Sequence, residues 1–256
     1  MDNSTALAGL SGAHLNAYEG WRTHITRALR SFAQESVRAP LFISRSTLEQ
    51  SGYLGNFPQQ VMSAHAGADT ETADIFLTPA SCLHIYAGQE GKSLHGGAVS
   101  LIEGTCVRHE NGKWDPPYRL PAFTMLECVF LGSVEEIDAA AKNMQKVMEE
   151  IFAGAAIPVS VVPATDAFFL GSNEGARLLQ QLKGLKKEFT VTEGDKTIAL
   201  ASLNLHEDYF GKKFSITKEG APVHSLCAAF GIERLAIHSV TLWGKDTAHW
   251  PAPFRS

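Results

Sequence analysis

The chain has 256 residues, which suits one sizeable domain with its own hydrophobic core. Hydrophobic residues make up 45% of it and charged residues 19%, an ordinary mixture for a globular protein. The formal net charge is -5, whereas a protein that grips a long nucleic acid backbone normally shows a basic face. Extensive tRNA or DNA binding is therefore disfavoured, and only a local basic patch remains open.

The N-terminal segment has neither a basic start nor a long apolar run, so we do not expect a signal peptide. The apolar run at residues 153–164 contains two prolines and is shorter than the roughly 20 residues that span a bilayer. We therefore expect a cytoplasmic protein with no membrane partner. In a reducing compartment, cysteines are expected to be thiols or metal ligands rather than disulfides. The cysteines are Cys82, Cys106, Cys128 and Cys227.

The first half of the chain begins with an amphipathic pattern at residues 12–34, which predicts a helix. Its apolar positions at helical spacing are Leu15, Tyr18, Trp21, Ile25, Leu29 and Phe32. Residues 50–61 are punctuated by glycine and proline and are interpreted as a loop. Residues 74–79 are interpreted as a strand end, and residues 98–109 and 122–132 as two strands joined by a long polar loop.

The second half begins with Ser133-Val-Glu-Glu136, a capping box that predicts the start of a long helix. Residues 157–164 are predicted as a strand, residues 173–187 as a helix, and residues 189–191 and 197–206 as further strands. Residues 225–239 begin as a strand and become helical around Gly231. Because strands and helices do not alternate regularly, we predict an α+β fold with a mostly antiparallel sheet flanked by helices.

One block of sequence combines the residue types that bind phosphates and purines. It reads Cys106-Val-Arg-His-Glu110, then a loop, then Arg119-Leu-Pro-Ala-Phe-Thr-Met-Leu-Glu127. Arg108 and Glu110 point the same way on a strand, and a strand arginine can clamp a phosphate or carboxylate. Phe123 can stack on a purine. Taken singly, the arginine and glutamate are more often a surface salt bridge, and the phenylalanine is more often core.

Two motifs in a fixed order make a stronger pattern than either alone. The R-x-E strand, the loop and the F-T-M-x-E strand resemble motif 2 of the class II aminoacyl-tRNA synthetases. About a hundred residues later, Ala229-Phe-Gly-Ile-Glu-Arg-Leu235 resembles motif 3, whose arginine, here Arg234, binds ATP. A lone G-x-E-R-L would be weak, since its charges could be solvated on a helix. Motif 1 is not clear, and the segment SGYLGNFP is the nearest candidate.

The resemblance extends to a narrower family, the amino acid:[carrier protein] ligases. These are bacterial relatives of the atypical zinc-dependent seryl-tRNA synthetases of methanogens, and they lack the tRNA-binding domain. The segments that carry it are 77–82, 108–110, 123–127, 204–206 and 227–234. It implies a single class II synthetase-like catalytic domain over residues 1–256, with a helical insertion near residues 171–188 and no tRNA-binding domain. It also implies a homodimer.

The resemblance further implies a zinc site, because family members hold zinc with two cysteines and a glutamate. The matching residues here are Cys82, Glu127 and Cys227. Thiolates and a carboxylate suit Zn²⁺, and three protein ligands leave a fourth position open, as in catalytic sites. An amino group could take that position, which would select amino acids. No CxxC pair supports zinc by spacing, and buried thiols are the usual fate of cysteines. Cys106 and Cys128 are interpreted as small core residues.

Two further polar residues are candidates for substrate binding. Asp166 matches a family acid that contacts the substrate amino group, although an aspartate in this setting is nearly as often a helix cap or turn residue. Asn204, just before motif 3, is a candidate for hydrogen bonding to substrate or ATP, or else a strand residue that faces solvent. His84, His109 and His206 are less distinctive, and surface or hydrogen-bonded roles are more usual for them.

As a mechanism, the resemblance implies adenylation of an amino acid followed by transfer to a phosphopantetheine thiol on a carrier protein. Arg108 would meet the α-phosphate and substrate carboxylate, and Glu110 would orient the nucleotide. Phe123 would stack under adenine, and Arg234 would stack above it or reach the γ-phosphate side. Mg²⁺ would bridge the phosphates. Catalysis would then consist of positioning and charge stabilisation. Family relatives favour small amino acids such as glycine or alanine.

The expected carrier is acidic, so a basic surface should receive it. The predicted helix at residues 173–187 would supply one, although a solvated helix face is an equally good reading. Its basic residues are Arg177, Lys183, Lys186 and Lys187.

Three alternatives remain open. The chain could charge tRNA as an atypical seryl-tRNA synthetase-like enzyme, although its acidity argues against this. It could be a non-catalytic synthetase-like module that binds an amino acid or nucleotide. Such modules usually lose the motif arginines, whereas Arg108 and Arg234 are present here. The third alternative, chance motifs in an unrelated α+β domain, is disfavoured by two motifs in the right order.

Overall fold

The computed structural model describes residues 9–65, 74–109, 114–164 and 184–255. Among these residues, the α-helices are α1 (Gly12–Leu29), α2 (Arg45–Gln50), α3 (Tyr53–Asn56), α4 (Leu83–Gly88), α5 (Val134–Gly154), α7 (Tyr209–Lys213) and α8 (Ile232–Trp243). Short 3₁₀ turns are η2 (Pro58–Gln60), η4 (Thr247–His249) and η5 (Ala252–Phe254). None of the described helices combines the length and apolar character that crossing a membrane would require.

The described strands form one large sheet and two small ones. The large sheet has the order β1-β6-β7-β13-β10-β9-β8, and its only parallel pair among the described strands is β1 with β6. Its strands are β1 (Glu35–Arg38), β6 (Ala98–Val107), β7 (Ala122–Gly132), β8 (Ser160–Pro163), β9 (Lys186–Glu193), β10 (Lys196–Glu207) and β13 (His224–Gly231). The small sheets contain β2 (Phe42–Ser44), β3 (Ser63–Ala64) and β4 (Ile75–Leu77), and β5 (Ser93–Leu94), β11 (Thr217–Lys218) and β12 (Ala221–Pro222).

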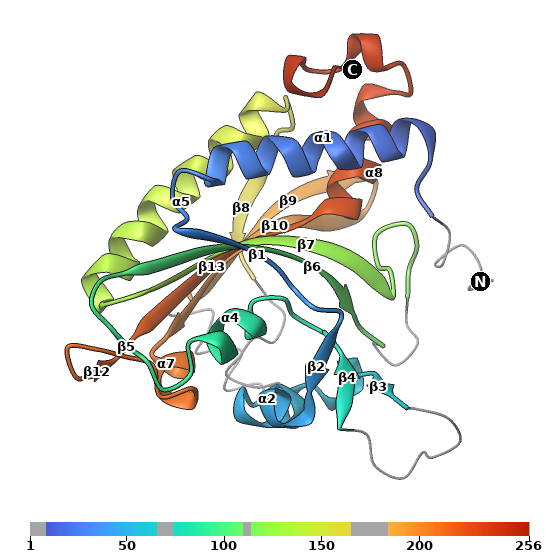
Figure 1. Cartoon of the computed structure of the whole chain (residues 1–256). Helices are drawn as coiled ribbons and strands as arrows, with labels where there is room; N and C mark the ends of the chain where they lie inside the picture. Colours follow the sequence, from blue (N-terminus) through green and yellow to red (C-terminus); the bar gives the residue numbers. More distant parts are fainter. Residues whose placement is uncertain (1–8, 66–73, 110–113, 165–183, 256) are drawn as a thin grey trace.

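Three long helices cover one face of the large sheet, as Figure 1 shows for α1, α5 and α8. On α1, residues spaced by four are buried against this face, and among them the Trp21 indole N–H donates to Ser239 Oγ on α8 at 2.8 Å. On α5, the Ser133 hydroxyl caps the backbone of Glu136, and the Glu136 carboxylate returns to the Ser133 backbone. This reciprocal cap is the one that the sequence predicted, and it fixes where the helix begins.

The strand period of two divides β7 between the two faces of the sheet. Leu126, Cys128 and Phe130 pack in the core under α1, α5 and α8, whereas Val129 belongs to a second core on the opposite face. Glu127 shares that opposite face with Val129. The second core is covered by α4, α7 and the small sheet of β2, β3 and β4 (Figure 1). The sheet therefore separates two interiors, and the predicted site residues of β7 and β13 face the second one.

A glycine on β6 brings the segment before α4 onto the sheet. A Cβ added at Gly104 would lie 2.5 Å from Ala39 Cβ and 3.0 Å from Ser81 Oγ. Both distances are shorter than ordinary contacts, so only a residue without a side chain allows this approach. The neighbour of Ser81 is Cys82, at the start of α4.

Several local predictions from sequence differ from the structure. Leu15 is 44% exposed, because the buried stripe of α1 runs through Ala17 and Trp21 rather than through Leu15. Residues 50–61 contain α3 and η2 rather than only a loop. Lys186 and Lys187 are the first residues of strand β9, not the end of a helix. The alternating residues of 188–192 pair with β10, and this pairing extends back through both lysines.

Candidate metal centre and nucleotide site

Two neighbouring antiparallel strands carry the predicted metal ligands Glu127 and Cys227. Glu127 on β7 lies opposite Ala229 on β13, and Cys227 lies opposite Val129. Positions two apart share a face, so both side chains project into the second core. Both are buried, and Cys227 Sγ donates to Glu127 Oε2 at 2.9 Å.

Cys82 joins this pair from outside the sheet. The segment before it is fixed to β6 by the Val107 N–H, which donates to the Thr78 carbonyl at 2.8 Å. Cys82 Sγ, a Glu127 carboxylate oxygen and Cys227 Sγ all lie within 4.8 Å of one another. We name this group the Cys-Glu-Cys cluster. The fold thus brings together three residues that are separated by 45 or more positions in the sequence.

The electrostatics of the Cys-Glu-Cys cluster are dominated by burial. Burial raises the pKa of Glu127, against the lowering effects of the Cys227 hydrogen bond and the Arg108 charge. The pKa of Cys227 is raised well above its usual range, first by its hydrogen bond with Cys82 and then by burial. A divalent cation would favour the thiolate and carboxylate forms instead. Two thiolates and one carboxylate this close together fit Zn²⁺, whose bonds to such donors are about 2.0–2.3 Å long.

Asn204 lies beside the cluster because it is the cross-strand partner of Cys227. Its Nδ2 donates to Ser202 Oγ at 3.0 Å and to the Cys227 carbonyl at 3.4 Å. Its Oδ1 is buried and has no hydrogen-bond partner among the described residues. Such an acceptor is costly unless a donor reaches it. Asn204 is therefore a buried strand residue rather than a solvent-facing one.

Further along the same face, a buried histidine adjoins the cluster region. His206 Nδ1 lies 3.3 Å from Tyr86 Oη and 3.2 Å from Ser225 Oγ. Burial lowers the pKa of His206 to about 3, so the ring is neutral near pH 7. His84 is also hydrogen-bonded, with its Nε2 3.0 Å from Thr78 Oγ1. Both histidines contribute hydrogen bonds to the interior.

Arg108 and Phe123 lie together at the end of the β6–β7 pair. The Arg108 guanidinium carbon is 5.3 Å from the centroid of the Phe123 ring, and Arg108 Nε donates to the Pro79 carbonyl at 2.9 Å. The positive charge of Arg108 partly offsets the burial that raises the pKa of Glu127, and it also acts against the raised pKa of Cys82. The arginine thus links the aromatic ring to the Cys-Glu-Cys cluster.

Arg234 lies in the first turn of α8, directly after β13. Its Nε donates to the Tyr118 carbonyl at 2.7 Å, and its Nη1 donates to the Ala199 carbonyl at 3.0 Å. The neighbouring Glu233 accepts the Thr124 backbone N–H at 2.7 Å. The residues after the motif 2 loop are therefore bound directly to the motif 3 helix.

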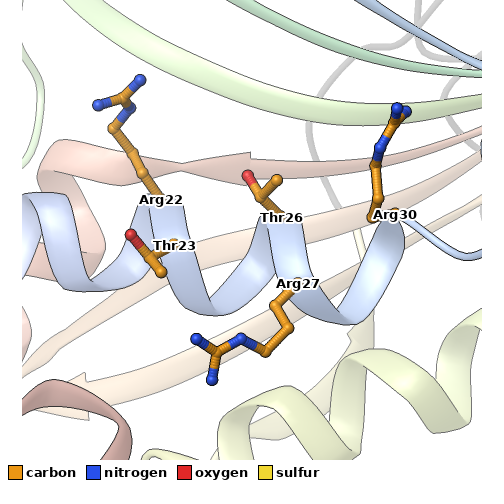
Figure 2. A pocket seen from close by; sticks show the side chains of 5 residues that line it. All are labelled: Arg22, Thr23, Thr26, Arg27 and Arg30. Atoms are coloured by element: carbon orange, nitrogen blue, oxygen red, sulfur yellow. The ribbon is translucent and has the colours of Figure 1, made fainter.

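A pocket of about 430 Å³ lies along α1, and none of the predicted site residues lines it. Figure 2 shows its lining residues, which are Arg22, Thr23, Thr26, Arg27 and Arg30. Arg22 donates to Glu103 on β6 at 2.9 Å and thereby ties the helix to the sheet. The pocket is distinct from the two groups of residues described above.

Comparison with known proteins agrees with this architecture. No protein-family model matches the chain. It is 29% identical over 252 residues to amino acid–[acyl-carrier-protein] ligase 1 of Bradyrhizobium diazoefficiens, covering 88% of this chain and 77% of the relative. It is 31% identical over 247 residues to ligase 2 of the same organism, covering 86% and 73%. The chain belongs to the amino acid–[acyl-carrier-protein] ligase family.

The fold of this family member is that of the class II synthetase core. The structure matches M. kandleri seryl-tRNA synthetase, solved with a tRNA from A. aeolicus, with a TM-score of 0.80 and 17% sequence identity. The match covers 95% of this chain and 55% of the synthetase chain. The predicted α+β fold with an antiparallel-rich sheet is therefore confirmed.

Some predicted site residues of this ligase lie outside the described residues. They are Glu110, Asp166, Arg177 and Lys183. Lys186 and Lys187, predicted to lie on the same helix as the last two, belong to β9. Lys186 Nζ is 3.1 Å from Glu188, and Lys187 Nζ donates to Gln145 on α5 at 2.8 Å. Consecutive strand residues point to opposite faces, so the two lysines do not form one patch.

Other residues near the site were missed by the sequence interpretation. Tyr118, in the loop between β6 and β7, and Glu193, the last residue of β9, contact each other and carry no motif of their own. His238 was detectable in principle, because it lies four positions after Arg234 and so shares a helix face with it. Its contact with Glu193 is seen only in the folded chain.

Proposed function

We propose that this chain activates a small amino acid with ATP and transfers it to the phosphopantetheine thiol of a carrier protein. The observation that carries the proposal is 31% identity, over 86% of the chain, to a Bradyrhizobium diazoefficiens amino acid–[acyl-carrier-protein] ligase. The Cys-Glu-Cys cluster, Arg108 and Arg234 support the same chemistry. Glycine and alanine are the amino acids that we expect.

Substrate selection is proposed to occur at the Cys-Glu-Cys cluster. Cys82, Glu127 and Cys227 would hold Zn²⁺, which supplies a Lewis acid position for a neutral α-amine. The buried Asn204 Oδ1 next to Cys227 would accept a hydrogen from that amine. Asp166, by its match to the family acid, would contact the substrate amino group. Carboxylic acids without an α-amine would not be held.

Adenylate formation is proposed to occur between the cluster and Arg234. A carboxylate oxygen of the amino acid attacks the α-phosphorus of ATP, and the bond to the departing pyrophosphate breaks. Arg108 would neutralise charge on the α-phosphate, while Phe123, Glu110 and Arg234 would orient the nucleotide, with Mg²⁺ on the phosphates. No side chain forms a covalent intermediate, so positioning and charge stabilisation supply the rate enhancement.

In the transfer step, the phosphopantetheine sulfur attacks the carbonyl carbon of the adenylate and AMP leaves. We propose that Arg177 and Lys183 help to dock an acidic carrier. Lys186 and Lys187 are not part of this docking surface, because they lie on opposite faces of β9. Lys186 contacts Glu188, and Lys187 contacts Gln145. Reversing the charges of Arg177 and Lys183 should slow transfer and spare adenylation.

We further propose a cytoplasmic homodimer. Exposed apolar side chains on and next to the small sheet of β2, β3 and β4 offer surface that a second copy could cover. They are Leu41, Phe42 and Ile75. Sedimentation equilibrium would measure the mass directly, and a monomer at micromolar concentration would contradict the proposal.

The deciding experiment is ATP–pyrophosphate exchange on zinc-loaded protein with each of the twenty amino acids, followed by acceptor assays. We expect exchange with one or two small amino acids. Label should then pass to a phosphopantetheinylated carrier and not to total tRNA. Transfer to tRNA alone would favour the synthetase-like alternative. A folded, metal-loaded protein that exchanges with no amino acid would favour a non-catalytic binding module.

A further inference from the structure

Three residues outside the recognised motifs, Tyr118, Glu193 and His238, form a hydrogen-bond network with Arg234. The Tyr118 hydroxyl donates to both carboxylate oxygens of Glu193, at 2.7 Å each. Glu193 is also hydrogen-bonded to Nδ1 of His238, which lies one turn after Arg234 on α8. The Tyr118 carbonyl accepts Arg234 Nε at 2.7 Å. The network therefore begins at Arg234 and ends at His238, both on α8.

These bonds join three separate parts of the chain. Tyr118 belongs to the loop between β6 and β7, Glu193 is the last residue of β9, and the other two residues are on α8. The Tyr118 ring also packs against the core under the helices, and His238 is 7% exposed. Hydrogen bonds in such partly dry surroundings, one of them to a carboxylate, hold geometry more firmly than exposed ones.

We propose that Tyr118, Glu193 and His238 are positioning residues that orient Arg234 for the nucleotide. A guanidinium is planar, so two carbonyl acceptors on Nε and Nη1 fix the direction in which its plane faces. One of those acceptors is the Tyr118 carbonyl, and the position of Tyr118 is set by Glu193 and His238. The inference rests on the proposed function, in which Arg234 binds ATP.

Disrupting this network should weaken ATP binding and leave amino acid binding unchanged. Loss of the network would leave Arg234 in place but less firmly oriented, and reorienting it on binding would weaken the interaction with ATP. The Cys-Glu-Cys cluster lies on the opposite face of the sheet from the core that Tyr118 contacts. The amino acid site should therefore be unaffected.

The test uses pyrophosphate exchange with Tyr118→Phe, which removes the hydroxyl and keeps the packed ring. We expect KM for ATP to rise about 5- to 10-fold, a loss the size of one ordinary hydrogen bond, with KM for the amino acid within about 2-fold of wild type. Glu193→Ala should behave alike, and Glu193→Gln, which keeps an acceptor oxygen, should recover part of the loss. The double variant Tyr118→Phe/Glu193→Ala should be no worse than either single variant, because the residues act as one unit.

The matched control is Lys196→Ala. Lys196 Nζ and Asp115 Oδ2 form an exposed ion pair at 2.8 Å between the same hairpin and the same loop, without contact to Arg234. We expect its KM for ATP to stay within about 2-fold of wild type, as for a weak surface pair. An unchanged KM for ATP in Tyr118→Phe, or an equal rise in both KM values, would overturn the inference. Absence of exchange in the wild type would instead count against the proposed function.

Discussion

The two faces of the large sheet use the same strands for opposite purposes. On β13, Leu226, Ala228 and Phe230 point into the core under α1, α5 and α8, while Ser225 and Cys227 point into the other interior. The first core has few buried polar side chains, among them Ser239, which accepts the Trp21 indole N–H, and His238, which is bonded to Glu193. The second contains buried polar side chains, which are Thr78, Ser81, Glu127, Asn204, His206 and Ser225. One face therefore supplies stability that the polar face would otherwise lack.

This division predicts that substitutions on one strand separate into two kinds. Changes under the long helices should lower the free energy of unfolding and leave metal binding intact. Changes on the opposite face should affect ligand binding or its pH dependence more than packing. Cysteines offer a direct test, since Cys128 and Cys227 lie on adjacent strands but face opposite ways.

The largest effect is expected for Cys227→Ala, which removes one of the three donors of the Cys-Glu-Cys cluster. We expect bound zinc to fall below about 0.1 per chain at micromolar protein, and exchange activity to fall at least about 100-fold, because a metal with two remaining protein ligands is weakly held. Zinc is measured by elemental analysis after gel filtration. Cys128→Ala is the control and should keep full zinc content. Equal zinc in both variants would contradict the assignment.

The next largest effect should come from the apolar face. Phe230 is fully buried, and its ring centroid is 6.3 Å from that of Phe152. Phe230→Ala should lower the free energy of unfolding by about 3–5 kcal/mol, through lost burial and the remaining cavity. Urea unfolding measures it, and Leu242→Ala, at a residue that is 49% exposed, should cost less than about 1 kcal/mol. Loss of zinc from natively folded Phe230→Ala would contradict the expectation that the two faces of the sheet act independently.

A smaller effect concerns pH on the polar face. Burial lowers the folded-state pKa of His206 to about 3 from its ordinary 6.5. Below pH 6.5 the unfolded chain therefore takes up a proton that the native chain does not, and stability falls as the pH drops towards 3. Each pH unit in this range costs about 1.4 kcal/mol, or about 2 kcal/mol by pH 5.

Replacing His206 with glutamine removes this proton and should flatten the change in stability between pH 6.5 and pH 5. Urea unfolding of both proteins across this range at constant ionic strength provides the slope. His249→Gln, at a side chain that is 78% exposed, is the control and should follow the wild type. Parallel slopes for wild type and His206→Gln would show that the buried ring does not produce the dependence.

The smallest effect is expected at the start of α5. Ser133→Ala removes the capping hydroxyl and should cost about 1 kcal/mol in unfolding free energy, with exchange kinetics unchanged. Ser11→Ala is a matched control, because Ser11 precedes α1 in the same position but makes no side-chain capping bond. Thermal unfolding of the two variants separates them. A larger loss in Ser11→Ala would contradict the assigned caps.

The features predicted from sequence are those with a strong local signal. The capping box at Ser133 and the paired strands around Arg108 and Phe123 needed only neighbouring residues, and the structure has both. The predicted helix end at Lys187 was wrong because strand pairing with β10, a long-range interaction, decides that segment.

For the site, the residue types suggested many candidate ligands and binding residues, and the resemblance to a family identified which of them to expect. Spacing alone could not unite Cys82 with Glu127, since the approach depends on the fold of β6 and the segment beside it. The role of Tyr118 was also unreadable, because its partners Glu193 and His238 come from other elements. Contacts between side chains of separate elements leave no periodic trace in a sequence.

If the Cys-Glu-Cys cluster holds a metal as proposed, the bare backbone of Gly104 lets a residue that is not a ligand set the metal affinity. The Cβ of an alanine there would lie 2.5 Å from Ala39 Cβ and 3.0 Å from Ser81 Oγ, so both neighbours would have to move, and the residue next to Ser81 is Cys82. Displacing one donor by a few tenths of an ångström strains every bond to a small ion at once. A substitution at position 104 should therefore change the metal affinity of the proposed site without changing any of its ligands.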